Sequence, residues 1–440
     1  MALLRALLVS YSFPPVGGAG VQRIAKLAKY LPGHGVRPAV LTVANPSVPV
    51  HDDTLLSDVP AAVEITRART LEPAYVSKRA AWRARAGGGS RAERGLGAIA
   101  RLAGHALFPD PQVLWQPAAQ RALLARIAAK RDDVVLVSGP PFSQFLLAPL
   151  ARVAGLGVVL DYRDEWITLR AAYEMAPSPV ARTLGNALEA ALLRRAHAVV
   201  VATDEFRTNL LARFSFLDPG RIVTIPNGYD PSDFPDDLPS PPRDRFVLTY
   251  AGTVFALTSA RGLLAAVRSL HARHPALARA LRVRFVGRIV ETELAAFDGT
   301  EALGVDRIGY VSHARVVTEL AASHATLCLL DDVAGAERIY PAKIFELMRL
   351  GRPVLTLAPP GSALARLVER HALGPVVHPR DEEGIASDLE QRLKAFHRDD
   401  YRLDAWRNAT DIRRYDRRAL AGEFAEVLRD AASAGRRRSL

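Results

Sequence analysis

A lysine and a glutamate three residues apart interrupt an apolar stretch in YPAKIFELMRL (340–350). Residues at this spacing share one face of a helix, so Lys343 and Glu346 would lie opposite the face on which Ile344 and Leu347 pack. A carboxylate can accept hydrogen bonds from the hydroxyls of a ribose, and an ammonium binds phosphate as a compact charge. The alternative is a surface ion-pair ladder from Lys343 through Glu346 to Arg349, worth about 0.3–0.5 kcal/mol.

The choice of lysine at this position favours the phosphate-binding interpretation. Of the 58 cationic residues only six are lysines, and Lys343 is the only one between Lys130 and Lys394. A chain that otherwise uses arginine has placed a compact, flexible charge here.

A glycine-rich segment, SYSFPPVGGAGVQRIAKL (10–27), lies between a predicted strand and a predicted helix. Gly17, Gly18 and Gly20 remove side chains where a ligand could approach the backbone, and the helix N-terminus offers N–H groups to an anion. The segment is neither G-x-G-x-x-G nor a P-loop. A tight turn without a ligand is the alternative.

Charged residues cluster in DYRDEW (161–166), directly after another predicted strand. Asp161 or Asp164 could accept or position the proton of a reacting hydroxyl group, with Arg163 between them. A local ion-pair turn at the strand end is the alternative interpretation.

Apolar runs typical of buried strands alternate with amphipathic helical stretches along the chain. This rhythm predicts an α/β protein with two Rossmann-like, doubly wound parallel sheets that face a central cleft. Between them YDPSDFPDDLPSPPRDR (229–245), with five prolines, predicts a linker. The strands are expected at 3–11, 37–44, 132–139, 155–162, 196–203, 221–228, 246–252, 281–287, 325–330 and 352–358.

We therefore expect an N-terminal domain over 1–228, with a basic insertion at 67–102, and a C-terminal domain over 246–410. The last residues, 411–440, would form a helix that can return to the N-terminal domain, followed by a basic tail. Ligands of such sheets bind beyond the carboxyl ends of the strands.

The net charge of +12 belongs mostly to the first half of the chain, because residues 1–200 hold 24 Lys and Arg against 14 Asp and Glu. The segment 67–102 alone has nine cations and two acids. It is either a solvated insertion or a surface attracted to anionic lipid head groups or to a phosphorylated acceptor. No zinc-finger spacing or aromatic RNA-binding motif supports nucleic acid as a partner.

Several absences narrow the class of protein. A single cysteine, Cys328, excludes an internal disulfide framework, and no apolar run reaches the length of a membrane-spanning helix. The apolar N-terminus is better explained as a buried strand than as a signal peptide, so a cytoplasmic protein is expected. There is no D-x-D motif and no metal-ligand spacing of histidines. His313 and His324 are isolated in the sequence and are expected to be structural.

Several of these segments, in this order, resemble family 4 glycosyltransferases of the GT-B fold. They are the glycine-rich loop, IPNGYDPSDF (225–234), YAGTV (250–254), YPAKIFELMRLGRPVL (340–355) and VVHPRDEEGIASDLEQRL (376–393). SGPPFSQFLLA (138–148) and LDYRDEW (160–166) are similar to the branch that builds bacterial cell-surface polysaccharides.

The resemblance implies a retaining transfer of sugar from a UDP- or GDP-sugar to a hydroxyl of a glycan or lipid-linked sugar, without a metal or other cofactor. The donor would lie against the C-terminal domain and the acceptor against the N-terminal one. A nucleotide-sugar epimerase of the same fold and a catalytically inactive sugar-nucleotide-binding homologue are the rival interpretations.

Position by position, the resemblance places Glu346 at the donor ribose and Lys343 and Ile344 at the diphosphate, where Lys343 would assist departure of the leaving group. Gly18 would touch phosphate from the other domain. Arg261, in ARGLL, stands where the family binds diphosphate with lysine.

The chain departs from the family pattern at three places. Arg338 replaces the glutamate, eight residues before Glu346, that contacts the sugar, so its neighbour Glu337 is the substitute candidate. Thr253 stands where many members have a phosphate-binding arginine, and Arg163 stands in place of an N-terminal-domain histidine.

Overall fold

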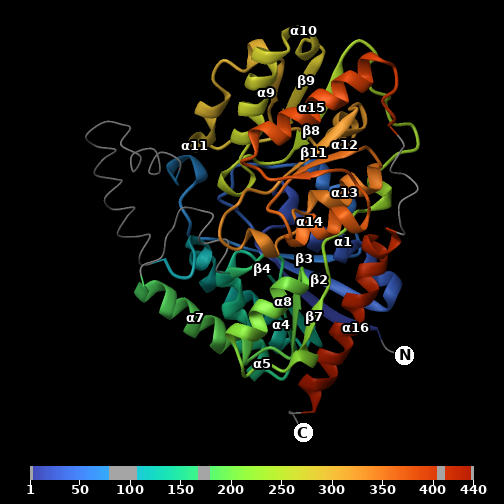
Figure 1. The fold of residues 1–440 in the computed structure, drawn as a ribbon. Coiled ribbons are helices and arrows are strands. Elements are labelled where there is room, and N and C mark those ends of the chain that lie inside the picture. The colour runs from blue at the N-terminus through green and yellow to red at the C-terminus, as the bar shows by residue number, and fades with distance from the viewer. Residues whose placement is uncertain (1–2, 79–106, 167–178, 404–411, 438–440) are drawn as a thin grey trace.

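The computed structural model describes residues 3–78, 107–166, 179–403 and 412–437. Figure 1 shows two α/β domains, one above the other, each with a sheet between layers of helices. Every strand pairing within the two sheets is parallel. The predicted pair of doubly wound sheets is confirmed.

The N-terminal sheet has seven strands in the order β3-β2-β1-β4-β5-β6-β7. Its central strands are buried along almost their whole length, as expected for a sheet covered on both faces. The strands are β1 (Leu4–Val9), β2 (Val36–Val43), β3 (Glu64–Ala68), β4 (Val134–Gly139), β5 (Gly157–Tyr162), β6 (Ala198–Val201) and β7 (Ile222–Thr224).

The C-terminal sheet has six strands in the order β10-β9-β8-β11-β12-β13. Because strand order reverses beside β8, the ends of β8 and β11 form a switch point of the kind where ligands bind. The strands are β8 (Phe246–Ala251), β9 (Leu281–Val286), β10 (Val305–Ile308), β11 (Ala325–Leu329), β12 (Val354–Leu357) and β13 (Val376–Val377).

Helices cover both faces of each sheet and create two apolar cores per domain. The N-terminal domain has α1 (Gln22–Tyr30), α4 (Gln116–Ala128), α5 (Ala148–Val153), α7 (Pro179–Leu193) and α8 (Asp204–Arg213). The C-terminal domain has α9 (Arg261–Arg273), α10 (Pro275–Ala278), α11 (Glu291–Leu294), α12 (His313–Ala321), α13 (Lys343–Leu350), α14 (Ala363–Arg370) and α15 (Glu382–His397).

The last helix, α16 (Arg417–Arg436), leaves the junction of the domains and runs along the N-terminal one (Figure 1). Its Phe424 and Leu428 are buried in the same core as Leu8 and Ile24. Burial of each such side chain stabilises the fold by about 1.5–3 kcal/mol, so the C-terminal segment is part of the N-terminal domain's structure.

Helix α13 follows β11 and carries the lysine–glutamate pair. Its apolar stripe is fully formed, with Ile344, Leu347 and Met348 buried. Gly351 ends the helix in the left-handed region at φ 73°, which glycine adopts without a steric penalty.

Three strands were not predicted from the sequence: β3, β10 and β13. All three lie at sheet edges or are very short, and β10 exposes Asp306 and Arg307. Such strands lack the continuous apolar run that marks a strand buried on both faces. β3 overlaps the start of the predicted insertion 67–102, of which residues 79–102 lie outside the described part.

Among the described residues, no helix combines the length and the apolar composition that crossing a membrane requires.

Candidate functional site

The carboxyl ends of the two sheets face each other across the domain junction. Tyr310, just after β10, donates a hydrogen bond from its hydroxyl to Asp52 Oδ2 of the N-terminal domain at 3.0 Å. The same hydroxyl lies so close to the loop after β1 that a Cβ on Gly17 would be 2.7 Å from it. The glycine-rich loop and the strand ends of the C-terminal domain are therefore adjacent.

The glycine-rich loop connects β1 to a short 3₁₀ turn, Ala19–Val21, and then to α1. Gly18 has φ 96°, a conformation that side-chain-bearing residues rarely adopt, and residues 18–20 are exposed. Gly20 is close to Arg163, whose guanidinium a Cβ would approach to 3.3 Å. All three predicted glycines thus lie on one loop that has an exposed backbone.

Lys343 lies at the first residue of α13, beside the end of β8. Its ammonium is 3.7 Å from the centre of the Tyr250 ring, a cation–π contact, and a Cβ on Gly252 would lie 2.4 Å from its Nζ. Within the described residues Lys343 has no carboxylate within 4 Å. The geometry therefore contains no Lys343–Glu346 ladder, and the ammonium remains available to an anion.

Glu346 points to a histidine instead of to Lys343. His313 Nε2, at the start of α12, lies 3.1 Å from Glu346 Oε1, and its Nδ1 lies 3.7 Å from Asp233 Oδ2 in the linker. Burial lowers the pKa of His313, but the two carboxylates outweigh it and raise that pKa to about 9. Burial raises the pKa of Glu346, yet the imidazolium holds it below its ordinary value.

The linker carboxylate belongs to a buried charge cluster that also includes α1. The Lys26 ammonium, with its side chain 1% exposed, lies 2.8 Å from Asp58 and 2.7 Å from each of Asp230 and Asp233. In the described part of the chain these three aspartates are the one group close enough together to hold a metal ion. Because an ammonium already lies among their oxygens, and Lys29 contacts two of them, the cluster is an ion-pair network.

Asp161, at the end of β5, is fully buried in an ion pair. Arg23 of α1 contacts it at 2.8 Å, and the Ser138 hydroxyl donates to its Oδ2 at 2.6 Å. Arg23 also donates to the carbonyl oxygens of Ile225 and Pro226, each at 2.9 Å. The geometry gives Asp161 a role in fixing α1 and the strand ends rather than in contacting a substrate.

Arg163 and Asp164 follow β5 and lie nearer the loop. The Arg163 guanidinium donates to the carbonyl oxygens of Gly20 and Pro140, and burial lowers its pKa. Asp164 is half-buried, and burial raises the pKa of its carboxyl group, although Arg163 and Arg23 act in the opposite direction. Of the two predicted aspartates, Asp164 is the one left accessible to a reacting group.

Arg338 joins the two domains. Its guanidinium contacts Glu165 of the N-terminal domain at 2.7 Å, and its carbonyl oxygen accepts from the Thr203 hydroxyl at 2.7 Å. Glu337, which is half-exposed, contacts Arg338 as well. A second interdomain ion pair links Arg366 to Glu205. The residue that departs from the family pattern therefore contributes to the domain contact.

The remaining predicted donor residues differ in their environments. Arg261 is more than half exposed, contacts Glu293 at 3.2 Å and donates to the Thr292 carbonyl at 2.7 Å. Thr253 is exposed after β8. The Ile344 side chain is buried, and its backbone N–H donates to the Pro341 carbonyl at 3.0 Å, so this amide already has a partner.

The sequence did not reveal which residues contact the predicted site residues. His313 is not isolated, because the fold brings Glu346 and Asp233 to its two nitrogens. Glu165 lay within DYRDEW and Asp233 within IPNGYDPSDF, so both were inside recognised segments. The pairing itself joins residues more than 30 positions apart, which sequence spacing does not reveal. His324 is structural, as predicted: its Nδ1 accepts from the Val247 N–H at 3.1 Å and it stacks on Phe246.

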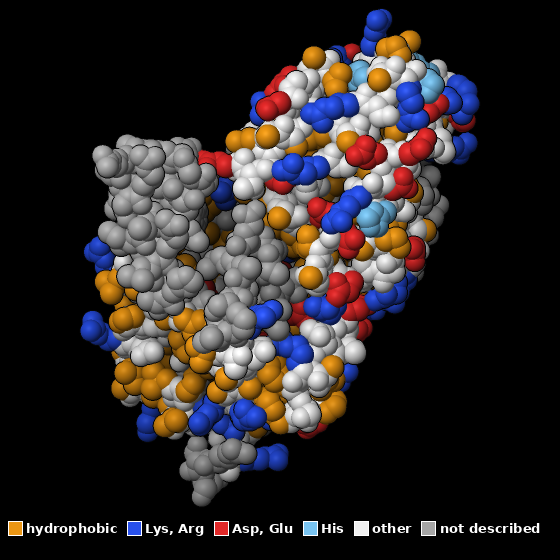
Figure 2. Space-filling view, turned by 60° about the vertical axis from the view of Figure 1, so that its left-hand side comes forward, with side chains coloured by type: hydrophobic (Ala, Val, Ile, Leu, Met, Phe, Trp, Pro, Cys, Tyr) orange, Lys and Arg blue, Asp and Glu red, His pale blue; other side chains and the backbone are white. Residues whose placement is uncertain are grey.

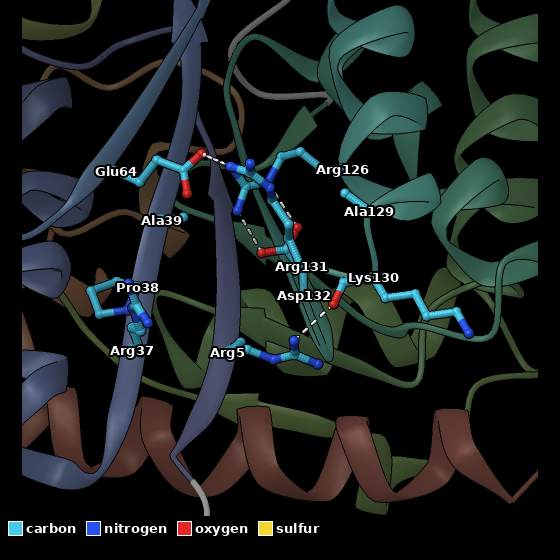
Figure 3. A pocket seen from close by; sticks show the side chains of 10 residues that line it. All are labelled: Arg5, Arg37, Pro38, Ala39, Glu64, Arg126, Ala129, Lys130, Arg131 and Asp132. Atoms are coloured by element: carbon cyan, nitrogen blue, oxygen red, sulfur yellow. Dashed lines mark hydrogen bonds and ion pairs between the residues drawn. The ribbon is translucent and has the colours of Figure 1, made fainter.

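A separate cavity of about 300 Å³ lies at the opposite, amino ends of β1, β2 and β3 (Figure 3). Its carboxylates are paired, Asp132 with Arg126 at 2.8 Å and Glu64 with both Arg126 and Arg131. Because the glycine-rich loop lies at the other ends of these strands, this cavity is not part of the site described above.

Comparison with known proteins gives one domain match and several structures with the same fold. Residues 17–228 match the glycosyl transferase 4-like domain. No curated protein sequence matches the chain.

Among solved structures, sucrose-phosphate synthase from Thermosynechococcus elongatus is similar over 98% of this chain and 100% of its own, with a TM-score of 0.63 and 15% identity. HepE from Anabaena, solved in complex with UDP and glucose, is similar over 97% of this chain and 99% of its own, with a TM-score of 0.62 and 16% identity. WaaG, a glycosyltransferase involved in lipopolysaccharide biosynthesis, is similar over 98% of this chain and 98% of its own, with a TM-score of 0.54 and 15% identity.

The chain has the two-domain GT-B fold of these solved structures. Its N-terminal domain is a glycosyl transferase 4-like domain, as the sequence motifs indicated.

Proposed function

We propose that the protein transfers a sugar from a UDP- or GDP-sugar to a hydroxyl group of an acceptor glycan or lipid-linked sugar, with retention of the anomeric configuration. The product would belong to a cell-surface polysaccharide or glycolipid. The observation that carries this proposal is the start of α13, where Lys343 has no acidic partner and Glu346 has one carboxylate oxygen, Oε2, without a hydrogen bond among the described residues.

In this proposal Glu346 Oε2 accepts a hydrogen bond from the donor ribose, while Lys343 and the exposed backbone of the glycine-rich loop hold the diphosphate. The solved HepE structure contains UDP and glucose, which supports a UDP-sugar donor. The loop around Gly17 is adjacent to Tyr310 of the C-terminal domain, which supports a ligand that both domains contact. Arg261 would reach the diphosphate after leaving Glu293.

The reaction breaks the bond between the anomeric carbon and the β-phosphate oxygen, and the electron pair leaves with the nucleoside diphosphate. The acceptor oxygen forms its bond to the same face of the anomeric carbon. Lys343 offsets the charge that develops on the departing phosphate. The acceptor proton passes to the carboxylate of Asp164, whose raised pKa makes it a stronger base than an ordinary aspartate.

The test is mass spectrometry of reactions with a panel of UDP- and GDP-sugars, each with and without acceptor glycans. Transfer to an acceptor supports the proposal. Isomerisation of the donor without an acceptor would identify an epimerase, and nucleotide binding without any turnover would identify an inactive homologue.

Glu346→Ala supplies the matched binding test. Loss of a charged hydrogen bond costs about 1.5–3 kcal/mol, so the affinity for the nucleoside diphosphate, measured by calorimetry, should fall at least tenfold. Arg349→Ala, on the exposed side of the same helix, should leave it unchanged. Equal affinities for Glu346→Ala and wild type would refute the ribose assignment.

We further propose that the enzyme acts in the cytoplasm and binds anionic membranes peripherally through its N-terminal domain. Figure 2 shows apolar and basic side chains interspersed over the lower part of the molecule, which this domain forms. Leu124, Val153 and Leu184 of this domain are at least half exposed, and Arg121 and Arg182 are exposed on the helices that carry Leu124 and Leu184. Each cation near an anionic surface contributes about 1 kcal/mol.

Co-sedimentation with vesicles tests the membrane proposal. Binding to anionic vesicles at low salt, release at high salt and no binding to neutral vesicles are expected, because charge attraction is screened within about 10 Å at 0.1 M salt. Failure to bind anionic vesicles at low salt would indicate a soluble acceptor.

A further inference from the structure

His313 occupies an unusual position between three elements of the structure. Its Nε2 contacts Glu346 of α13 at 3.1 Å, and its Nδ1 lies 3.7 Å from Asp233 of the linker. The side chains of His313, Glu346 and Asp233 are only 12–18% exposed. One imidazole therefore separates two carboxylates that would otherwise lie close together with little water between them.

The groups around His313 favour its cationic form. Glu346 and Asp233 face it directly, Lys26 of α1 contacts the far side of Asp233, and Arg417 of α16 acts on Glu346. The two carboxylates outweigh burial and the Lys26 charge, and the pKa of His313 is raised to about 9. As an imidazolium it donates from Nε2 to Glu346 and attracts Asp233 through its charge, with Nδ1 3.7 Å from Oδ2.

We propose that His313 is a positioning residue for donor binding: as an imidazolium it holds Glu346 Oε1, so that Oε2 is presented to the nucleotide, and it links this carboxylate to Asp233 of the interdomain linker. This inference rests on the proposed function, because it concerns the orientation of the group assigned to the ribose.

Deprotonation of His313 removes this arrangement. A neutral imidazole can still donate from Nε2 to Glu346, but it no longer attracts either carboxylate through a positive charge, so the repulsion between Glu346 and Asp233 is no longer offset. Nucleotide affinity therefore depends on the protonation of His313. The affinity is fully retained below the raised pKa of His313 and falls as pH rises through it, by up to tenfold per pH unit.

The experiment is calorimetric titration with UDP and GDP between pH 6.5 and 10, on wild type and three variants. For wild type we expect constant affinity to about pH 8.5 and a fall above it. His313→Gln should bind about tenfold more weakly at pH 7 and should lack that component of the fall, so the difference between the two curves isolates this residue from other groups that titrate near pH 10.

Two variants provide controls. Asp233→Asn removes one of the carboxylates that favour the imidazolium, so its affinity should begin to fall at a lower pH than in wild type, an effect that a merely structural role would not produce. His274→Gln changes an exposed histidine at the end of α9 and should reproduce the wild-type curve.

The outcomes separate the two proposals. Identical pH curves for wild type and His313→Gln, with both proteins binding nucleotide equally well, would overturn the role of His313 and leave the proposed function intact. If His313→Gln fails to fold, an unshifted curve for Asp233→Asn would overturn it. Absence of UDP and GDP binding by wild type at every pH would overturn both.

Discussion

The buried ammonium of Lys26 predicts a large and specific effect on stability. Lys26→Met keeps the length of the side chain but removes the charge that lies 2.7–2.8 Å from Asp58, Asp230 and Asp233. Removing one partner of a buried ion pair costs about 3–5 kcal/mol. Lys29 still contacts Asp58 and Asp230, so we expect the lower end, about 3 kcal/mol.

Thermal unfolding followed by circular dichroism at pH 7 measures this effect. A loss of 1 kcal/mol lowers Tm by about 2–4 °C in domains of 150–250 residues, so the transition that includes the N-terminal domain should fall by roughly 6–12 °C. Lys29→Met is the matched control. Lys29 contacts two of the same carboxylates but is 23% exposed, and its loss should cost about 1 kcal/mol or less.

The pH dependence provides a second check. The lysines lower the pKa of Asp58 and Asp230, against the effect of burial, whereas burial raises the pKa of Asp233. Stabilisation by Asp58 and Asp230 is present above their ordinary pKa of about 4 and is lost as pH falls through the depressed values. The difference between wild type and Lys26→Met should therefore shrink below about pH 4. A Tm loss no larger than that of Lys29→Met, or one independent of pH, would refute the reasoning.

Three further predictions follow from the same geometry. Lys343→Met should lower turnover about 100-fold while changing nucleoside diphosphate affinity much less; steady-state kinetics with calorimetry decides, and equal losses would indicate a uniform contact. Arg338→Met should destabilise the protein by about 3 kcal/mol, because the buried Glu165 loses the guanidinium that lies 2.7 Å from it; Arg338→Met combined with Glu165→Gln should recover part of that loss, and a strictly additive double variant would contradict the pairing. Activity should persist in excess EDTA, and activity that is abolished by EDTA and restored by manganese or magnesium would show that a metal is required.

Much of the architecture followed from sequence pattern. Strands such as β1, β4 and β8 are buried on both faces, so their residues form continuous apolar runs that need no knowledge of the partner strand. Edge strands were not predicted, for two reasons. β10 is partly exposed to solvent and contains Asp306 and Arg307, which interrupt the apolar run, and β13 has only two residues, too few to show a pattern. The sequence also marked the segments that meet at the domain junction, since glycines, a rare lysine and clustered charges are recognisable one residue at a time.

The roles within those segments depended on tertiary structure. Asp161 and Asp164 are equivalent in the sequence, yet Arg23, 138 positions before Asp161, buries one of them in an ion pair and leaves the other accessible.

The same holds for the pair formed by Lys343 and Glu346. Its three-residue spacing was compatible with a ladder, but the fold places His313 beside Glu346 and the Tyr250 ring beneath Lys343. By itself the sequence determined which residues could do chemistry, because residue type and local spacing are properties of the chain. Only the tertiary structure decided which of them are already neutralised, because charges interact through space over a few ångströms, whatever their separation along the chain.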